Sequence, residues 1–420
     1  MANARPPALI ADPHGWGAVA AIRSLGRQGI PVWLSAERMS YPASMSRYVK
    51  RRIRAPLPVD EARFLCWLRR SSARGAVPFA VDDASAWLYA RYLDELSPLY
   101  RMLQAPADAI RILQDKGALP GACSTAGLAT PSWLVAGPGE NPELDGLRYP
   151  VFVKPRTQAG ARFAFKGEIA RDPAAARALV ERFASREKMG NYDAAALGDM
   201  GAIVQPYIER PGNRVYGISG FVGRGGEFLG LRASYKTLQR PIENGNGICF
   251  EEAEVDSALA AGLARLSRQV GYIGMFEAEF LKDGAERLLI DFNCRLFNGI
   301  DFVIARGLDL PAMHYAAAVG DNAELARLSG VAARTGGPTG LVYCDRPRFD
   351  IALKRWQSSG VMSPAGVRRW RLWLTEHRGR VVQPTHDYRD PGPGLWVFAT
   401  NWAPVTVRAS LRRTRRRVRG

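Results

Sequence analysis

Residues 274–298 read GMFEAEFLKDGAERLLIDFNCRLFN, and this stretch is the most informative part of the sequence for predicting the fold. Two apolar runs, Met275–Leu281 and Leu288–Phe292, flank a charged turn at Lys282-Asp283-Gly284. Apolar runs of this length on both sides of a short glycine-containing turn indicate the strands of an antiparallel hairpin. We therefore expect a β-hairpin over residues 275–292.

Three oxygen-bearing side chains of this hairpin are expected to share one face. Because side chains alternate between faces along a strand, Glu279 on the first strand and Asp291 and Asn293 on the second can converge. Carboxylate and amide oxygens suit Mg²⁺ held together with a polyphosphate. Arg295 falls on the same face, where a guanidinium can grip a phosphate or a carboxylate. A solvated hairpin with ordinary surface charges is the alternative, but Asp291 and Asn293 lie inside an apolar run rather than at its ends.

Length and composition limit the class of protein. A chain of 420 residues with 47% hydrophobic residues can bury sizeable cores in two or three domains. No segment resembles a transmembrane helix or a signal peptide. The 5 cysteines lack CxxC spacing, which favours a reducing, cytoplasmic compartment over a disulfide scaffold or a zinc site. The 4 histidines show no metal-ligand spacing, so a histidine-based zinc enzyme is not expected.

The charge is strongly positive and unevenly placed. The formal net charge is +18, and 7 arginines lie in the last 13 residues, RASLRRTRRRVRG. Composition predicts a disordered basic tail over residues 408–420. Such a tail can tether a protein to nucleic acid or to anionic lipid, which would place it at the inner face of a membrane. It can equally be a solvated tail from an arginine-rich genome, and the sequence leaves both open.

The beginning of the chain predicts an open parallel sheet. A strand at Ala8–Ala11, a helix at Ala18–Arg27 and a strand at Ile30–Ser35 make a β-α-β unit. Gly15 and Gly17 between the first two elements resemble half of a dinucleotide-binding fingerprint, but the third glycine and the downstream acid are missing.

Two acidic residues follow the predicted strand Val77–Val81. Asp82 and Asp83 lie where a parallel strand ends, which is where such sheets hold ligands. An N-cap for the helix expected at Ala84–Leu93 explains them equally well.

Several lysines of the middle region lie at ends of predicted elements. Lys116 falls in a segment with a helical pattern, and Lys154 ends an apolar strand that Pro155 keeps from becoming helical. A loop follows at Arg156–Arg162, and Lys236 opens a polar, glycine-rich loop at Lys236–Gly247. A strand-end lysine before a flexible loop can contact phosphate, although an exposed lysine is more common there.

The composition shifts after Thr335. The segment Arg368–Leu374 (RRWRLWL) is expected to be a strand packed on the main domain with its arginines outward. The alternative is an amphipathic face that touches a membrane.

With these residues in view, the chain resembles the ATP-grasp ligases, especially the carbamoyl-phosphate-synthase-like and carboxylate–amine ligase branch. The resemblance runs in order from about Ala8 to Gly320. The matching segments are AIRSLGRQGIPV (residues 21–32), Ser-Arg-Tyr (46–48), Asp115-Lys116, Val153-Lys154-Pro155, Val204-Gln205-Pro206-Tyr207-Ile208, Glu279 and Asp291-Phe292-Asn293-Cys294-Arg295. No single segment is decisive, but this many in the expected order are hard to produce by chance.

The resemblance implies a mixed α/β and α+β architecture, the ATP-grasp fold, preceded by an open parallel-sheet domain. In such enzymes ATP lies between two α+β lobes. The residues implied to contact ATP are Lys116 and Lys154 at its phosphates, Gln205 with the backbone of Tyr207 and Ile208 at its adenine, and Glu209 as a weak candidate at its ribose. Glu279, Asp291 and Asn293 would hold Mg²⁺, for which Mn²⁺ can substitute.

The resemblance also implies a reaction. The family passes the γ-phosphoryl group of ATP to a carboxylate, and an amine then attacks the acyl phosphate. Arg295 would steady the transferring phosphoryl group, while Lys236 and Arg240 would contact phosphate or the substrate anion. Catalysis of this kind depends on charge neutralisation and in-line positioning more than on an acid–base residue.

Three departures from the family pattern bear on activity. Asp291 stands where Glu is usual, and it remains a competent Mg²⁺ ligand. Cys294 stands where proline is common and is expected to be a packing residue. The loop Arg156–Arg162, normally glycine-rich, contains only Gly160, so Arg162 and Lys166 would have to supply what backbone amides usually do.

These observations predict an ATP- and Mg²⁺-dependent ligase that joins a carboxylate to an amine, both small molecules. Phosphoryl transfer to a hydroxyl on the same fold, and a non-catalytic ATP-binding protein tethered by its basic tail, are the alternatives. A homodimer is the expected assembly. The expected division is a pre-ATP-grasp domain at 1–108, a small lobe with its lid at 109–205, a large lobe with the metal site at 206–330, an extension at 331–407 and the tail at 408–420.

Overall fold

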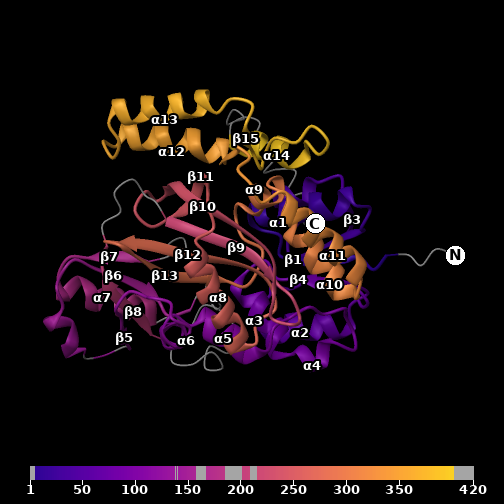
Figure 1. Ribbon diagram of the computed structural model, residues 1–420, viewed down its shortest axis with the longest axis horizontal. Helices are drawn as coiled ribbons and strands as arrows, with labels where there is room; N and C mark the ends of the chain where they lie inside the picture. Colours follow the sequence, from indigo (N-terminus) through magenta and orange to yellow (C-terminus); the bar gives the residue numbers. More distant parts are fainter. Residues whose placement is uncertain are drawn as a thin grey trace, which may run out of the picture.

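A computed structural model gives the structure of the chain and describes residues 5–137, 139, 141–157, 167–184, 201–208 and 215–401. The described residues form a 7-stranded sheet and two 4-stranded sheets. Figure 1 shows the parallel sheet of the N-terminal part at the right, the small sheet at the lower left and the large sheet between them. Among the described residues, no helix is long and apolar enough to span a membrane.

The N-terminal sheet is parallel, with strand order β3-β2-β1-β4. The β-α-β unit predicted at its start is confirmed. The elements are β1 (Ala8–Ala11), α1 (Gly15–Arg27), β2 (Val32–Ala36), the 3-10 turn η1 (Pro42–Met45), β3 (Val49–Arg54), α2 (Glu61–Arg70), β4 (Val77–Phe79), α3 (Asp83–Arg91) and α4 (Leu93–Leu96). Asp82 begins α3 with a capping box, in which its side chain accepts from Ser85 N.

The small sheet has strand order β5-β8-β6-β7 and is antiparallel. The elements of this part are α5 (Ala107–Gln114), α6 (Leu119–Thr125), β5 (Leu134–Ala136), the 3-10 turn η2 (Pro142–Gly146), β6 (Val151–Pro155), β7 (Glu168–Ala170), α7 (Pro173–Ala184) and β8 (Ala202–Pro206). Val180 and Phe183 of α7 are buried against Val151 and Val153 of β6. Lys116 lies in the turn between α5 and α6, so the prediction that it lies in a helix is wrong.

The large sheet has strand order β13-β12-β9-β10-β11-β14-β15. Its strands are β9 (Val215–Val222), β10 (Phe228–Arg240), β11 (Asn246–Ala253), β12 (Gly274–Asp283), β13 (Glu286–Asn293), β14 (Val342–Cys344) and β15 (Val381–Val382). The hairpin predicted from residues 274–298 is confirmed as β12 and β13. The loop predicted at Lys236–Gly247 is wrong in its first part, because β10 continues through Arg240 and pairs with β11.

The two faces of this sheet differ in polarity. Phe276, Phe280 and Phe292 pack against Leu263 and Leu266 of α8 (Ser257–Val270) in one apolar core. The alternate residues of β12 and β13 therefore face the small sheet. The helices directly after the hairpin are α9 (Ile300–Ala305), α10 (Leu310–Val319) and α11 (Asn322–Arg334), and all of them contribute to the same apolar core as α1.

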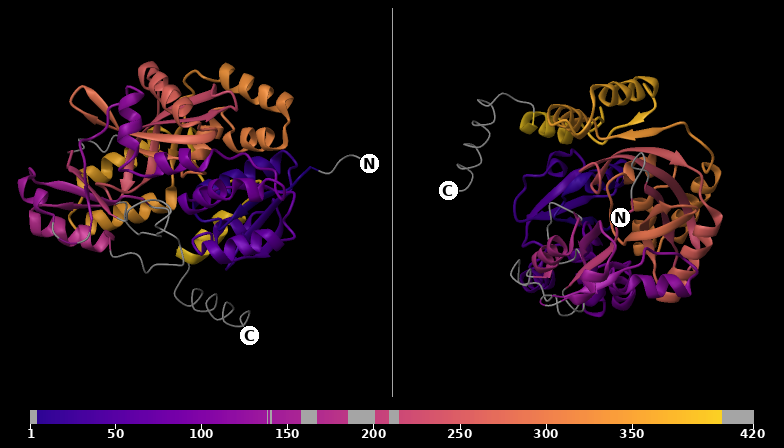
Figure 2. Two further views of the ribbon diagram at one scale, coloured as in Figure 1. Left: turned by 90° about the horizontal axis from the view of Figure 1, so that it is seen from below. Right: turned by 90° about the vertical axis from the view of Figure 1, so that its left-hand side faces the viewer.

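The last described part packs partly on the large sheet, beside β11 and β14, and partly, through its final helix, on η1 of the N-terminal part. It contains α12 (Arg346–Ser358), α13 (Pro364–Glu376) and α14 (Gly392–Asn401). Figure 1 shows α12 and α13 beyond β10 and β11, and Figure 2 shows them as a separate layer. The strand predicted at Arg368–Leu374 is wrong, because these residues lie in α13. Ser363 caps that helix, and Trp370, Trp373 and Leu374 recur at the helical spacing that packs against the α12 core.

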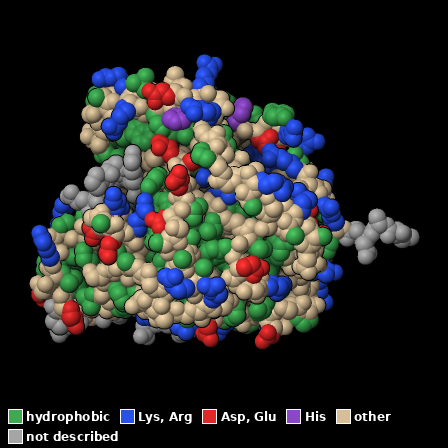
Figure 3. Space-filling model, in the orientation of Figure 1, with side chains coloured by type: hydrophobic (Ala, Val, Ile, Leu, Met, Phe, Trp, Pro, Cys, Tyr) green, Lys and Arg blue, Asp and Glu red, His purple; other side chains and the backbone are tan. Residues whose placement is uncertain are grey.

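Domain borders stay predictions, and α11 runs across the border expected at residue 330. The basic tail at 408–420 lies outside the described residues. In the view of Figure 3, Lys and Arg side chains are spread widely over the surface and Asp and Glu are fewer, in keeping with 58 basic and 40 acidic residues.

Candidate functional site

The hairpin places four polar residues on the face opposite the aromatic core. Glu279 pairs directly with Asp291, and Glu277 pairs with Asn293. Asn293 Nδ2 donates to Glu277 Oε2 at 3.1 Å. The convergence predicted for Glu279, Asp291 and Asn293 follows from this register, because all of them have the parity opposite to Phe276, Phe280 and Phe292.

Lysines from two different elements meet the two facing carboxylates. Lys236 Nζ of β10 lies 2.5 Å from Glu279 Oε1, and Lys116 Nζ lies 3.2 Å from Asp291 Oδ1. Glu279, Lys236 and Lys116 are all less than 10% exposed, at 7%, 5% and 9%. Charges this deeply buried are tolerated when they are paired.

Lys154 approaches the same face from the small sheet. It lies near the end of β6 and its Nζ donates to the backbone oxygen of Ile290 at 3.3 Å. Ile290 is the residue that the irregular register of β13 leaves between Leu289 and Asp291. The strand-end lysine predicted from Val153-Lys154-Pro155 is therefore brought to the strand that carries Asp291 and Asn293.

The turn that presents Lys116 is anchored to the residue after β6. Arg156 donates from Nε to Asp115 Oδ1 at 2.7 Å and from Nη2 to Asp115 Oδ2 at 2.8 Å. Lys116 N donates to the backbone oxygen of Arg156 at 3.0 Å. A bidentate Arg–carboxylate pair has a fixed geometry, so Asp115 acts as the anchor that sets the direction of Lys116.

A small cavity of about 50 Å³ lies among these groups. Its lining consists of Lys116, Phe152, Lys154, Val215, Lys236, Gln239, Asn244, Gly245, Glu279, Ile290 and Asp291. This volume holds an ion or a water molecule but not a nucleotide. The donor set around it contains carboxylate oxygens and ammonium groups, which are the partners of a hard cation and of phosphate oxygens respectively.

A much larger cavity of about 1080 Å³ lies between the small and the large sheet. Gln205, Tyr207 and Ile208 line it from the end of β8, and Tyr216 and Arg287 line it from the large sheet. A mostly apolar cavity with a few polar groups is the usual form of a small-molecule site.

The backbone of the β8 exit is partly engaged within the protein. Tyr207 N donates to the backbone oxygen of Pro150 at 3.1 Å, so a ligand in the cavity would find the amide of Ile208 rather than that of Tyr207. Glu209, the candidate for a ribose contact, lies outside the described residues, as do residues 158–166 of the loop after Lys154.

Arg295 leaves the hairpin and turns toward the N-terminal sheet. Its Nε donates to Asp83 Oδ1 at 2.6 Å. Burial lowers the pKa of Arg295, but Asp83, Asp291 and Asp82 outweigh burial and raise its pKa, so the guanidinium stays charged. Of the two explanations offered for the Asp82-Asp83 pair, the N-cap is confirmed for Asp82, which caps α3. Asp83 pairs with Arg295, and a ligand at this strand end stays a prediction.

Arg240 is not brought to the small cavity, whose described lining contains Lys236 and Gln239 instead. It ends β10, where burial and then the guanidinium groups of Arg355 and Arg348 lower its pKa. Glu277 is the residue of this face that the sequence reasoning missed. Its position two residues before Glu279, on the same face of the same strand, was the available signal.

Comparison with known proteins supports the fold by structure and not by sequence. No family model matches the chain, and no curated protein matches it significantly. An L-amino acid ligase from Bacillus licheniformis superposes with a TM-score of 0.58 at 15% identity, over 75% of this chain and 76% of that one. A biotin carboxylase from Campylobacter jejuni, solved with an ATP analogue, gives 0.53 at 16% identity, over 74% and 71%.

An N5-carboxyaminoimidazole synthetase from Staphylococcus aureus, solved with ADP, gives a TM-score of 0.51 at 15% identity, over 75% of this chain and 78% of that one. These proteins have the ATP-grasp fold. At such identities the likeness establishes the fold alone, and the chain has the ATP-grasp fold predicted from its sequence.

Proposed function

We propose that this chain is an ATP- and Mg²⁺-dependent ligase that joins a carboxylate to an amine through an acyl phosphate. The observation that carries the proposal is the pairing of Lys116 with Asp291 and of Lys236 with Glu279 around a buried cavity. The turn after α5 and the strands β10, β12 and β13 deliver these side chains. A purely structural role would not need two cations and two carboxylates in one place.

The two cavities divide the nucleotide between them in this proposal. The large cavity has the size and apolar lining for a nucleoside, with Gln205 and the backbone at Ile208 as hydrogen-bonding groups. The phosphates would extend toward Lys116 and Lys154, since both ammonium groups reach the polar face of the hairpin. Glu209 stays a candidate for the ribose.

The residues present fit a hard divalent cation. Glu279 and Asp291 offer facing carboxylates and Asn293 an amide oxygen, all on one face of one hairpin. Oxygen donors of this type are what Mg²⁺ and Mn²⁺ prefer. When bound, the cation neutralises charge on the phosphates and so makes phosphoryl transfer easier.

The chain's own residues would then position the reacting groups. Lys116, Lys154 and Lys236 neutralise phosphate oxygens, and Arg295 holds the transferring phosphoryl group or the acyl phosphate in a fixed fork. Arg240, with Arg348 and Arg355 nearby, offers positive charge to an anionic substrate. The amine then forms the C–N bond as phosphate leaves.

An ATP-dependent hydroxamate assay tests the function. The protein is incubated with Mg²⁺-ATP, hydroxylamine and a panel of carboxylic acids that includes the proteinogenic amino acids, since a structural neighbour is an L-amino acid ligase. A hydroxamate formed together with ADP supports the proposal, because only an activated acyl group reacts this way. A stable phosphoester would indicate transfer to a hydroxyl, and ATP binding without ADP release would indicate a non-catalytic protein.

Three further proposals rest on the sequence alone. They are a cytoplasmic location, a homodimer, and a tether to nucleic acid or anionic lipid through residues 408–420. Deleting the tail should abolish salt-sensitive retention on liposomes or nucleic acid while sparing catalysis. Retention that is unchanged by the deletion would reject the tether.

A further inference from the structure

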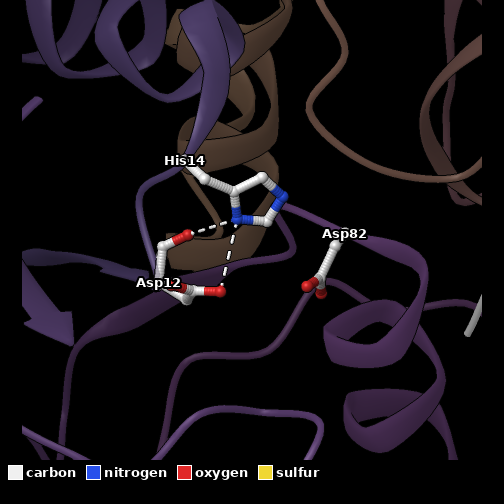
Figure 4. A group of neighbouring side chains, drawn as sticks. All are labelled: Asp12, His14 and Asp82. Carbon is white, nitrogen blue, oxygen red and sulfur yellow. Dashed lines mark hydrogen bonds and ion pairs between the residues drawn. The ribbon is translucent and has the colours of Figure 1, made fainter. Parts of the chain in front are cut away.

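His14 lies in the turn after β1 and is held by one residue, Asp12. His14 Nδ1 lies 2.8 Å from the backbone oxygen of Asp12 and 3.3 Å from Asp12 Oδ2. Both of these oxygens only accept hydrogen bonds, so Nδ1 must carry the proton. Figure 4 shows Nε2 on the other edge of the ring, away from Asp12, and the side chain is 41% exposed. The lone pair of Nε2 therefore lies on the edge of the ring that faces away from Asp12.

The residue that orients His14 is itself fixed. Asp12 is 1% exposed, and Tyr41 Oη donates to its Oδ1 at 2.6 Å. Its φ angle of 48° is the sole positive value among the described residues other than glycine. This conformation, which few residues other than glycine adopt, brings the carbonyl and the carboxylate of one residue onto the same ring nitrogen.

The start of α1, next to His14, packs against Phe297 and Asn298 of the segment that follows the hairpin. Trp16 N donates to Asn298 Oδ1 at 3.1 Å, and a Cβ atom at Gly17 would lie 2.6 Å from the backbone oxygen of Phe297. Gly17 is thus needed for the close approach of this segment. Arg295 precedes the segment directly, so the position of His14 is tied to the strand that carries Asp291 and Asn293.

Acidic residues complete the surroundings of the imidazole. Single side-chain atoms of Asp12, His14 and Asp82 all lie within 4.8 Å of one another. Asp83, the next residue, binds Arg295 at 2.6 Å. The imidazole therefore shares the Asp82-Asp83 turn with the guanidinium that we assign to the acyl phosphate.

We propose that His14 is the general base that accepts a proton from the attacking amine, with Asp12 as its positioning residue. This inference rests on the proposed function. Amines are protonated near neutral pH and cannot attack until a proton has been removed. Nε2 takes that proton, the nitrogen lone pair forms the C–N bond, and the bond from carbon to the phosphate oxygen breaks. Inorganic phosphate leaves with that electron pair and takes up the second proton that the nitrogen loses as the amide forms.

The charges around His14 suit this role. Burial lowers the pKa of His14, Asp82 opposes it, Arg295 lowers the pKa further and Asp83 raises it, and the balance is a lowered pKa. The ring is thus neutral and able to accept a proton near pH 7, while Asp12, Asp82 and Asp83 stabilise the imidazolium once it forms. Asp12, His14 and Asp82 could instead ligate a divalent cation, but the nearby charge of Arg295 disfavours one.

A comparison of two nucleophiles of different basicity tests the role of His14 independently of the proposed function. Hydroxylamine is uncharged at neutral pH and needs no base, whereas an amino-acid amine does. For His14→Gln we expect ATP-dependent hydroxamate formation at the wild-type rate and amide formation lower by at least about 100-fold, the usual contribution of a general base. The matched control is His377→Gln, because Nδ1 of His377 also lies near a backbone oxygen, that of Trp373 at 2.7 Å, far from the site.

The outcomes are distinct. Equal loss of hydroxamate and amide in His14→Gln, or loss of neither, would overturn the role of His14. No hydroxamate from the wild type with any acid would instead contradict the proposed function. A tightly bound metal ion, found by elemental analysis of the wild type and absent from His14→Gln, would also overturn the base. For His14→Ala, added imidazole should restore amide formation, and the pH at which that rate falls should shift to follow the added base.

Discussion

Lys236 and Glu279 lie on two strands that are separated by β9, and still their side chains meet at 2.5 Å. Both are nearly buried, at 5% and 7% exposure. Their contact crosses the polar face of the large sheet. It joins Lys236, which was expected in a loop, to Glu279, which is one of the predicted metal ligands. The pair ties the cation that would contact phosphate to the carboxylate that would contact the metal.

Removing one partner of this pair should destabilise the protein. Lys236→Met removes the ammonium group that contacts the buried Glu279 carboxylate, and breaking a buried pair costs about 3–5 kcal/mol. The double variant Lys236→Met/Glu279→Leu should recover most of that loss, because no uncompensated charge remains. Urea denaturation of the two variants and the wild type measures both effects. A single variant as stable as the wild type would show that the pair contributes nothing to folding.

Mg²⁺-ATP should stabilise the wild type and not a variant without the metal face. A ligand present at about 100 times its Kd adds about 2.7 kcal/mol, which a thermal-shift assay detects as a higher Tm. Asp291→Ala/Asn293→Ala should abolish this gain. Glu286→Ala is the matched control, since Glu286 is an exposed acid of the same hairpin. An equal Tm gain in the double variant would place the nucleotide elsewhere.

The sequence was sufficient for the hairpin because two strong signals coincide there. The alternation of Phe276, Ala278 and Phe280 with acidic residues specifies both the strand and its buried face. Lys116 and Lys236 were recognised as candidates, but each was assigned to the wrong element. Lys116 lies in a turn fixed by the bidentate pair of Asp115 with Arg156, and long-range contacts of this kind leave no local periodicity.

The two N-terminal segments that resemble the family also make long-range contacts that their local sequence does not predict. Arg23 from AIRSLGRQGIPV and Ser46 from Ser-Arg-Tyr both bond to Asp390 Oδ2, at 2.9 Å and 2.8 Å. Their partner lies more than 300 residues away along the chain, at separations of 367 and 344. Sequence reasoning found the segments but could not find that a C-terminal aspartate joins them.

Asp390 should therefore be a stability determinant. It is fully buried and pairs with Arg23, whose side chain is 8% exposed and also donates to the backbone of Pro384 and of Asp390 itself. Asp390→Asn keeps the shape but removes the charge, so we expect a loss of about 3–5 kcal/mol in the free energy of unfolding. Asp350→Asn is the control, because its pair with Arg346 is exposed and surface pairs contribute about 0–1 kcal/mol. Equal effects of the two substitutions would contradict this prediction.

His314 should make stability depend on pH in the acid range. Burial against Phe79 lowers its pKa to about 4, below the usual 6.5 of an unfolded chain. Below pH 6.5 the unfolded chain binds a proton that the folded chain does not, so stability falls as the pH drops from 6.5 to about 4. His314→Phe removes this titration, and its unfolding free energy should change less over that interval. Parallel pH profiles for the variant and the wild type would show that His314 is not the group responsible.

Arg295 offers a test of the chemistry rather than of the fold. Its guanidinium is directed by Asp83 at 2.6 Å, and an ammonium group cannot reproduce a planar fork. For Arg295→Lys we expect Mg²⁺-ATP still to raise the Tm, because the proposed contacts to adenine, the metal and the other phosphate oxygens belong to other residues and a lysine keeps the positive charge. Hydroxamate formation should fall by about 10²–10³-fold, the usual cost of losing one group that stabilises transition-state charge. Arg265→Lys, on α8, is the matched control and should leave the rate unchanged. A wild-type hydroxamate rate in Arg295→Lys would remove Arg295 from the phosphoryl-transfer step and leave its ion pair with Asp83 as a structural link between the hairpin and the N-terminal sheet.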